Sequence, residues 1–188
     1  MNLSSVKEPL SKVGAVGVLP TDTVYGLVAR ASDKEAVSRL YGLKERENKP
    51  GTIIAASIDQ LVDLGLKRRY LTAISAYWPG PLSVVIPCSQ ELDYLHLGKF
   101  GLAVRLPKGD ELIDLLKDVG PLLTTSVNMP GEAPANNLTE AKAYFGNQVD
   151  FYIDGGDLSS HQPSTIVRVI DDVVEVIREG AVKINDQS

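Results

Sequence analysis

The chain has 188 residues, of which 44% are hydrophobic and 23% charged, so it can bury a sizeable core and is expected to form one domain over residues 1–188. Its net charge of −5 argues against a protein that coats nucleic acid non-specifically, although a local basic pocket is compatible with it. Cys88 is the single cysteine, which excludes an internal disulfide, and neither a membrane-length apolar run nor a signal peptide is evident, so we expect a cytoplasmic protein without membrane contact.

Short β-rich runs alternate with helical patterns along the chain. Apolar runs with little alternation predict strands at 13–20, 51–57, 82–88, 101–107, 121–127 and 149–154. Near the C-terminus, 164–170 and 173–180 flank an Asp-Asp turn and predict a hairpin. Amphipathic patterns predict helices at 32–44, 57–65, 70–78, 109–120 and 138–146, the first with Asp33 as its N-cap. This alternation is typical of an α/β or α+β fold, and the terminal hairpin favours a mixed sheet.

The residues that build the commonest catalytic centres are absent or badly spaced. His96 and His161 are expected in loops and have no metal-ligand spacing. Cys88 follows a strand and Pro87, and is expected to be a buried small hydrophobe. No nucleophile elbow, Walker sequence or dinucleotide-binding glycine motif is present. An enzyme with this sequence would therefore act by positioning and electrostatics, without a metal site of its own.

Two groups of cations admit both a structural and a functional interpretation. Lys44, Arg46 and Lys49 lie in "LKERENKPG" at a predicted helix end, where they would either stay solvated or project over the sheet edge. Arg105 lies inside the apolar strand "GLAVRLP", where a charge is costly unless paired. It would either form a salt bridge with a nearby acid or bind a ligand carboxylate or phosphate.

Hydroxyl and amide side chains gather at the predicted strand ends. They occur in "PTDTVYGL" from Pro20, in "LLTTSVNMPGE" from Leu122 and in "PSTIV" from Pro163, with Arg178 in "VIREG" expected across the hairpin from the last of these. Ligands of open α/β sheets bind at such strand ends. Taken with the cations, these groups suit a polyanion together with a small zwitterion, that is, a nucleoside triphosphate and an amino acid.

The chain resembles the YrdC/TsaC family of threonylcarbamoyl-AMP synthases from about Val13 to Ala181. The likeness rests on "PTDTVYGL", "LKERENKP", "SAYWPGPLSVVIP", "GLAVRLP", "TTSVNMPGE", "PSTIV" and "VIREGAV", in that order. It implies a single-domain form with an open, twisted, mixed sheet and flanking helices around a positively charged cavity. It also implies a nucleotidyltransferase that joins L-threonine, bicarbonate and ATP into threonylcarbamoyl-AMP and pyrophosphate, with Mg²⁺ on the ATP phosphates. Separate threonylcarbamoyl-transfer proteins would then modify tRNA.

The resemblance also implies roles for individual residues. Those implied for threonine are Thr21, Thr23, Tyr25, Arg105, Ser126 and Ser164. Those implied for ATP are Lys44, Arg46, Lys49, Gly101, Thr125, Asn128 and Arg178. Within the second set, Lys44 and Arg46 match the catalytic K-x-R pair of the family.

The sequence departs from the family pattern at several places and leaves two other functions open. Glu47 replaces the proline that usually follows the K-x-R pair, and Ala55 and Ala56 stand where some members have a histidine near threonine. One alternative is a YciO-like paralogue or a carbamoyl-adenylate former with another substrate. The other is a non-catalytic module that binds tRNA or double-stranded RNA.

Overall fold

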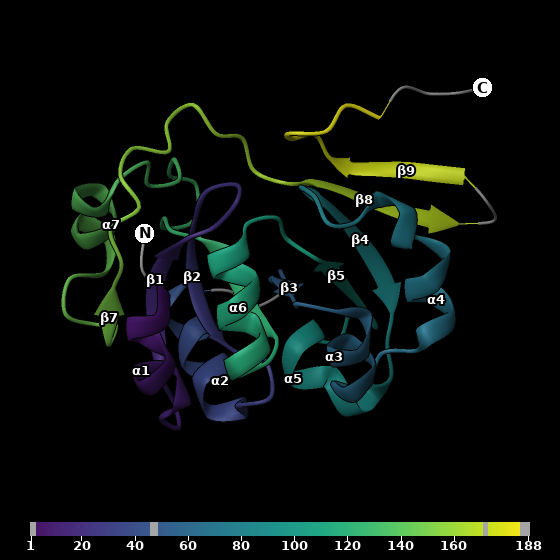
Figure 1. The fold of residues 1–188 in the computed structure, drawn as a ribbon, viewed down its shortest axis with the longest axis horizontal. Coiled ribbons are helices and arrows are strands. Elements are labelled where there is room, and N and C mark those ends of the chain that lie inside the picture. The colour runs from purple at the N-terminus through teal and green to yellow at the C-terminus, as the bar shows by residue number, and fades with distance from the viewer. Residues whose placement is uncertain (1–2, 46–48, 171–172, 185–188) are drawn as a thin grey trace.

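The computed structural model describes residues 3–45, 49–170 and 173–184. Their strands form one nine-stranded sheet in the order β7-β1-β2-β6-β3-β5-β4-β8-β9, which runs across the width of the molecule with β9 at one edge (Figure 1). The strands are β1 Val16–Pro20, β2 Tyr25–Arg30, β3 Thr52–Ile54, β4 Leu82–Pro87, β5 Gly101–Arg105, β6 Leu122–Ser126, β7 Phe151–Tyr152, β8 Thr165–Ile170 and β9 Val173–Arg178.

The sheet is mixed, as the sequence predicted. The β1/β7, β3/β5 and β4/β8 pairs are parallel, and the β1/β2, β2/β6, β3/β6, β4/β5 and β8/β9 pairs are antiparallel. The C-terminal hairpin is confirmed, although its Asp-Asp turn at 171–172 lies outside the described residues. Because consecutive strands are often not neighbours, residues far apart in the sequence meet at the same part of the sheet.

Short helices cover both faces of this sheet. The α-helices are α1 Lys7–Ser11, α2 Lys34–Leu43, α3 Ile58–Asp63, α4 Arg68–Ala73, α5 Asp93–His96, α6 Asp110–Val119 and α7 Leu138–Phe145, and the 3₁₀ turns are η1 Leu3–Val6, η2 Ser75–Tyr77 and η3 Gln90–Leu92. Asp33 caps α2 as predicted, since its side chain accepts hydrogen bonds from the backbone N–H groups of Glu35 and Ala36.

The apolar core divides between the two faces of the sheet. The larger cluster packs α2, α3, α4, α5 and α7 against one face. On the other face, Leu19, Val28, Ile54 and Leu122 pack against the N-terminal segment and α6. Side chains alternate along a strand, so the next positions on this second face are Gly26, Thr52 and Thr124. A cavity opens over these three positions.

The structure corrects the predicted elements at several points. β2 was not predicted, and neither was the N-terminal segment of η1 and α1 as part of the core. His96 is not in a loop: it is the last residue of α5 and is fully buried. Its Nε2 lies 3.1 Å from the carbonyl oxygen of Ser89, and its Nδ1 accepts a hydrogen bond from the backbone N–H of Phe100 at 3.3 Å. These bonds give His96 a structural role in the connection that precedes β5.

Candidate active site

A cavity on the second face of the sheet brings most of the predicted site residues together. Segments that contribute to its wall are the β1–β2 turn, the residues before β3, the ends of β5 and β6, the start of β8 and the end of β9. The predicted residues that line it are Thr21, Thr23, Tyr25, Arg105, Thr125, Ser126, Ser164 and Arg178. A single hollow therefore combines hydroxyl groups with two guanidinium groups.

Glycines keep the floor of this cavity at the level of the backbone. A Cβ atom at Gly26 would lie 2.5 Å from Oγ1 of Thr124, and one at Gly51 would lie 2.8 Å from the carbonyl oxygen of the same residue. Either contact would be a steric clash, so a side chain at these positions would displace the floor. The two glycines thus allow a ligand to approach the β2 and β6 backbones closely.

The threonines of the β1–β2 turn use their hydroxyl groups to fold the turn itself. The Thr21 hydroxyl donates to the carbonyl oxygen of Val24 at 2.7 Å and accepts the backbone N–H of Thr23 at 3.2 Å. Its Oγ1 also lies 3.0 Å from Oγ1 of Thr23. Since the Thr21 proton is committed to Val24, the Thr23 hydroxyl is the donor in this contact. The Thr23 oxygen is left with acceptor capacity, which suits a ligand ammonium or hydroxyl group.

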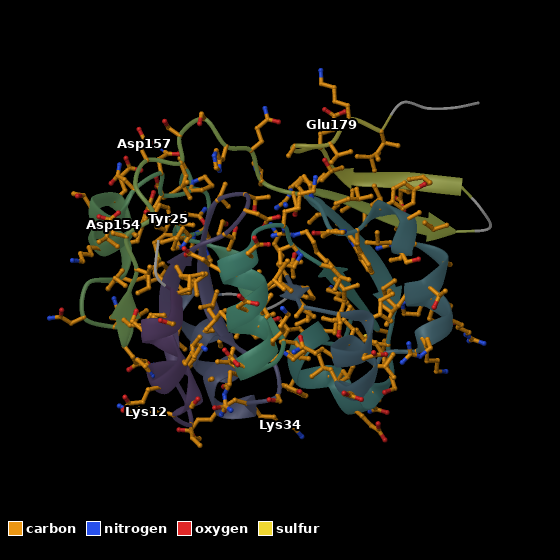
Figure 2. The ribbon with its side chains drawn as sticks, viewed as in Figure 1. Lys12, Tyr25, Lys34, Asp154, Asp157 and Glu179 are labelled. Carbon is orange, nitrogen blue, oxygen red and sulfur yellow. The ribbon has the colours of Figure 1, made fainter. Side chains whose placement is uncertain are left out.

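Tyr25 lines the cavity, but its hydroxyl forms hydrogen bonds outside it. The hydroxyl donates to the carbonyl oxygen of Gly156 at 2.9 Å and accepts the backbone N–H of Gly155 at 2.7 Å. Burial raises the pKa of Tyr25, so the phenol keeps its proton at neutral pH. Figure 2 shows Tyr25 close to the segment that carries Asp154 and Asp157. This residue therefore fastens that segment to the cavity wall.

Arg105 forms the salt bridge that was one of its two interpretations, and it also lines the cavity. It is 2% exposed, and its Nη1 donates to Oδ1 of Asp22 at 2.5 Å, so the salt bridge is present. The guanidinium also lines the cavity, where Nη2 lies 3.5 Å from Oγ1 of Thr23. Its buried Nε has no hydrogen-bond partner among the described residues. Donor capacity thus remains beside the cavity, which is consistent with binding a carboxylate there.

Ser164 is held by two partners that leave its proton available. Arg178 donates from Nη2 to Oγ of Ser164 at 3.1 Å and to its carbonyl oxygen at 2.6 Å. Oγ of Ser83 lies 2.9 Å from Oγ of Ser164 and is fully buried. A buried hydroxyl proton without an acceptor is costly, so Ser83 donates to Ser164. The remaining proton of Ser164 can be donated to an oxygen acceptor of a ligand.

Lys44 is buried and is not among the residues that line the described cavity. It is 2% exposed, and its Nζ donates to the carbonyl oxygens of Ser126, at 2.9 Å, and of Asn128. Nζ also donates to Oδ1 of Asn128 at 2.8 Å, an atom that accepts the Ser126 hydroxyl as well. The ammonium therefore organises the turn that follows β6.

Three other implied ATP residues do not line the described cavity. Asn128 is engaged by Lys44, and Lys49 is exposed. Gly101 shares a strand face with Arg105, but the two are four positions apart, which is roughly 13 Å along a strand. Arg46 lies outside the described residues.

Sequence reasoning did not assign a role to Asp22 or Ser83, and it placed Thr124 only within a cluster of hydroxyl and amide groups at a strand end. Asp22 was visible inside the "PTDTVYGL" motif, but a pairing with a residue 83 positions away leaves no local signal. Ser83 is a hydroxyl within an apolar strand, which is a signal of a buried polar partner. Thr124 forms part of the cavity floor.

The remaining features of the described residues offer less chemistry. A second hollow between α4, β4 and the β8–β9 hairpin is lined mainly by aliphatic side chains such as Val84, Val167 and Val174. Across the described ranges, no three His, Cys, Asp or Glu side chains cluster as metal ligands would. Within the same ranges, none of the helices has the length and apolar character needed to span a membrane.

Comparisons with known proteins agree with the motifs. The Sua5_yciO_yrdC family model, which carries the description Telomere recombination, matches residues 10–180. A Klebsiella pneumoniae protein named threonylcarbamoyl-AMP synthase is 36% identical over 154 residues, which cover 78% of this chain and 80% of that protein. The crystal structure of P. abyssi Sua5 complexed with L-threonine has a TM-score of 0.82 at 27% identity, covering 94% of this chain and 53% of that one. E. coli YciO has a TM-score of 0.80 at 25% identity, covering 95% and 89%.

This chain therefore belongs to the Sua5/YciO/YrdC family, and the expectation drawn from the motifs is confirmed. The expected open mixed sheet with flanking helices is confirmed as well, since it is shared with YciO. The chain spans about half the length of the P. abyssi Sua5 chain.

Proposed function

We propose that this protein is a threonylcarbamoyl-AMP synthase that makes threonylcarbamoyl-AMP and pyrophosphate from L-threonine, bicarbonate and ATP. The observation that carries the proposal is the cavity in which two arginines and two oriented hydroxyls converge on a glycine floor. The family membership of the protein and a relative that bears this enzyme name support the proposal further.

The cavity has complementary groups for an amino-acid zwitterion. Arg105 and the Ser164 hydroxyl are donors for a carboxylate, and the Thr23 oxygen is an acceptor for an amine or hydroxyl. Crystallised P. abyssi Sua5 holds L-threonine, which supports the same ligand here. Threonine would lie between the β1–β2 turn and the start of β8.

The proposed reaction needs positioning more than covalent help from the protein. The threonine amine combines with bicarbonate to give a carbamate and water. A carbamate oxygen then attacks the α-phosphorus of ATP, and the bond from that phosphorus to pyrophosphate breaks. Holding the reactants together can supply roughly 7–11 kcal/mol in favourable cases. Arg178 is at the cavity to offset charge on the leaving pyrophosphate, and Arg46 and Lys49 are proposed to assist it.

Mg²⁺ is proposed to enter as part of Mg-ATP. The charged side chains on the described wall are Arg105 and Arg178, which suit phosphate and carboxylate groups and not a cation. The phosphates of ATP would therefore hold the metal ion, and these arginines would orient the nucleotide around it.

The test is a reconstitution with purified protein. The protein is incubated with L-threonine, bicarbonate and Mg-ATP, pyrophosphate is measured, and the adenylate is identified by mass spectrometry. We expect turnover that requires both threonine and bicarbonate. Arg178→Ala should lower the rate at saturating threonine, whereas Arg168→Ala, an exposed change that removes the ion pair with Glu175 and does not touch the described cavity lining, should not. Threonine-independent ATP consumption, or none at all, would refute the assignment.

A YciO-like activity is the second candidate because YciO matches over nearly its full length. The same assay separates the two, since a paralogue would make no threonylcarbamoyl adduct while still binding a nucleotide. Direct tRNA binding, transfer partners and a cytoplasmic location follow from the synthase reaction as further proposals. Salt-sensitive RNA binding without ATP turnover would instead favour a binding module.

A further inference from the structure

Asp22 forms a buried ion pair with Arg105, the arginine that lines the cavity next to the β1–β2 turn. Its Oδ1 accepts Nη1 of Arg105 at 2.5 Å, and its Oδ2 accepts the backbone N–H of Lys108 at 2.9 Å. The carboxylate side chain is 9% exposed and is not among the described groups that line the cavity. Asp22 is therefore fixed at both oxygens and contacts a ligand only through Arg105.

The position of Asp22 is set by the topology of the sheet. The β1–β2 turn carries it, and β6 and β3 lie between β2 and β5 in the strand order. The turn must therefore reach over two intervening strands to place Asp22 against Arg105. The hydrogen bonds that Thr21 forms with Val24 and Thr23 hold the turn in shape. They therefore keep the Asp22 carboxylate within hydrogen-bond distance of Arg105. A long arginine side chain at a strand end is otherwise free to choose among several rotamers.

The Asp22–Arg105 ion pair also determines which guanidinium nitrogens of Arg105 can bind a ligand. With Nη1 bound to Asp22, Nη2 lies on the side of Thr23, and the buried Nε has no partner among the described residues. Asp22 also balances the buried charge of Arg105 before a ligand arrives, which removes the cost of an unpaired cation. A carboxylate entering the cavity then meets an arginine that is already oriented.

We propose that Asp22 is a positioning residue that sets the selectivity of the cavity for a free carboxylate on the amino-acid substrate. The proposal rests on the proposed function, because it assumes that an amino acid binds beside Arg105. Asp22 would act on recognition of that carboxylate and not on the nucleotide or on the chemical step.

The experiment compares L-threonine with L-threoninamide, which keeps the amine and hydroxyl but lacks the carboxylate charge. Dissociation constants for both are measured by calorimetry for the wild type, Asp22→Asn, Arg105→Lys and the double variant. Asp59→Asn, which breaks the exposed Arg68–Asp59 pair, is the matched control. Circular dichroism and thermal unfolding establish that each variant is folded. If Asp22→Asn does not fold, Asp22→Glu replaces it in the experiment.

We expect Asp22→Asn to weaken threonine binding by roughly 10- to 100-fold, the loss of one hydrogen bond between charged groups. Threoninamide binding should change little, so the preference for threonine collapses. In turnover, KM for threonine should rise while KM for ATP and kcat change less than about twofold. The double variant should lose little more than Arg105→Lys alone, because both changes remove the same interaction.

Two results would overturn the proposal in different ways. If Asp22→Asn weakens threonine and threoninamide equally, or changes neither, Asp22 does not act through carboxylate recognition, and the proposed function stands. If the wild type neither binds threonine nor forms the adenylate, the proposed function fails and this inference falls with it.

Discussion

At the scale of single residues, the cavity is built from side chains that already have partners. Thr21 folds its own turn, Tyr25 fastens the segment at Gly155, and Arg178 holds Ser164. Such bonds fix hydroxyl protons before a ligand binds, so less order has to be imposed on binding. The function of a motif residue is therefore divided between contact with the ligand and support of its neighbours.

Lys44→Met tests whether the lysine supports the turn after β6. Methionine keeps the apolar stem but leaves the carbonyl groups of Ser126 and Asn128 without this donor. Unsatisfied buried groups cost about 1–3 kcal/mol, so the free energy of unfolding should fall by that order. Urea unfolding of both proteins measures it. The control is Lys12→Met, an exposed lysine that lies away from Tyr25 in Figure 2 and does not line the described cavity, and it should be neutral.

The outcome for Lys44→Met separates two roles. Unchanged stability with lost turnover would indicate that Lys44 contacts phosphate directly, as the K-x-R motif implied. Lost stability together with lost turnover would agree with the geometry, in which the ammonium positions Ser126 and the cavity edge.

The residues that could be predicted from sequence were those whose motif stands beside the cavity. Thr23, Arg105 and Ser164, for example, line the same cavity. The burial of Lys44 could not be predicted, because a lysine at a helix end is usually solvated and only the tertiary packing of the β6 turn encloses this one. The pairing of Asp22 depends in the same way on contacts distant in sequence.

At the scale of elements, β2 illustrates why local pattern was insufficient. The residues between Pro20 and Tyr25 contain neither Gly nor Asn, which are the usual signals of a tight hairpin. Threonine hydroxyls close this turn by bonding to its backbone, so the reversal of the chain was missed and β2 with it. The longer helices, which have clear apolar periodicity and caps, were predicted to within a few residues.

Asp33 links α2 to the segment before β1 and should make stability depend on pH. Its carboxylate accepts the N–H groups of Ala36, at 3.0 Å, and Gly14, at 2.9 Å. Burial would raise the pKa of Asp33, but these donors outweigh it and hold the pKa below its ordinary value of 3.8. A lowered pKa means that the stabilisation is present above pH 3.8 and is lost as the pH falls through the lower folded value.

We therefore expect Asp33→Asn to be less stable than the wild type at pH 7, with a difference of about 1 kcal/mol. The difference should shrink as the pH is lowered below 3.8, because the wild-type carboxylate then gains its proton. Urea unfolding followed by circular dichroism at several pH values measures this. Asp63→Asn, an exposed change at the end of α3, is the control. A difference that is constant with pH would show that charge is not involved.

At the scale of the whole molecule, the cavity exists only when distant segments have joined the same sheet. Its wall includes Thr21 near the start of the chain and Arg178 near the end of the β8–β9 hairpin. The strand order that joins them is not sequential, and this is what the sequence could not reveal without the family resemblance. Figure 1 shows β8 and β9 at the far side of the sheet from β1 and β7, and β2, β6, β3, β5 and β4 lie between them in the strand order.

Ligand binding should consequently slow amide hydrogen exchange in two distant segments of the cavity wall at the same time. A ligand that binds only the folded protein stabilises it by about 2.7 kcal/mol at a concentration 100 times its dissociation constant. Its local effect should be greatest where it joins the β1–β2 turn, residues 21–24, to the start of β8 at Thr165. We expect amide hydrogen exchange in both segments to slow when threonine and Mg-ATP are added, whereas α1 should be unaffected at short exchange times. Protection of one segment alone would mean that the two walls do not bind a common ligand.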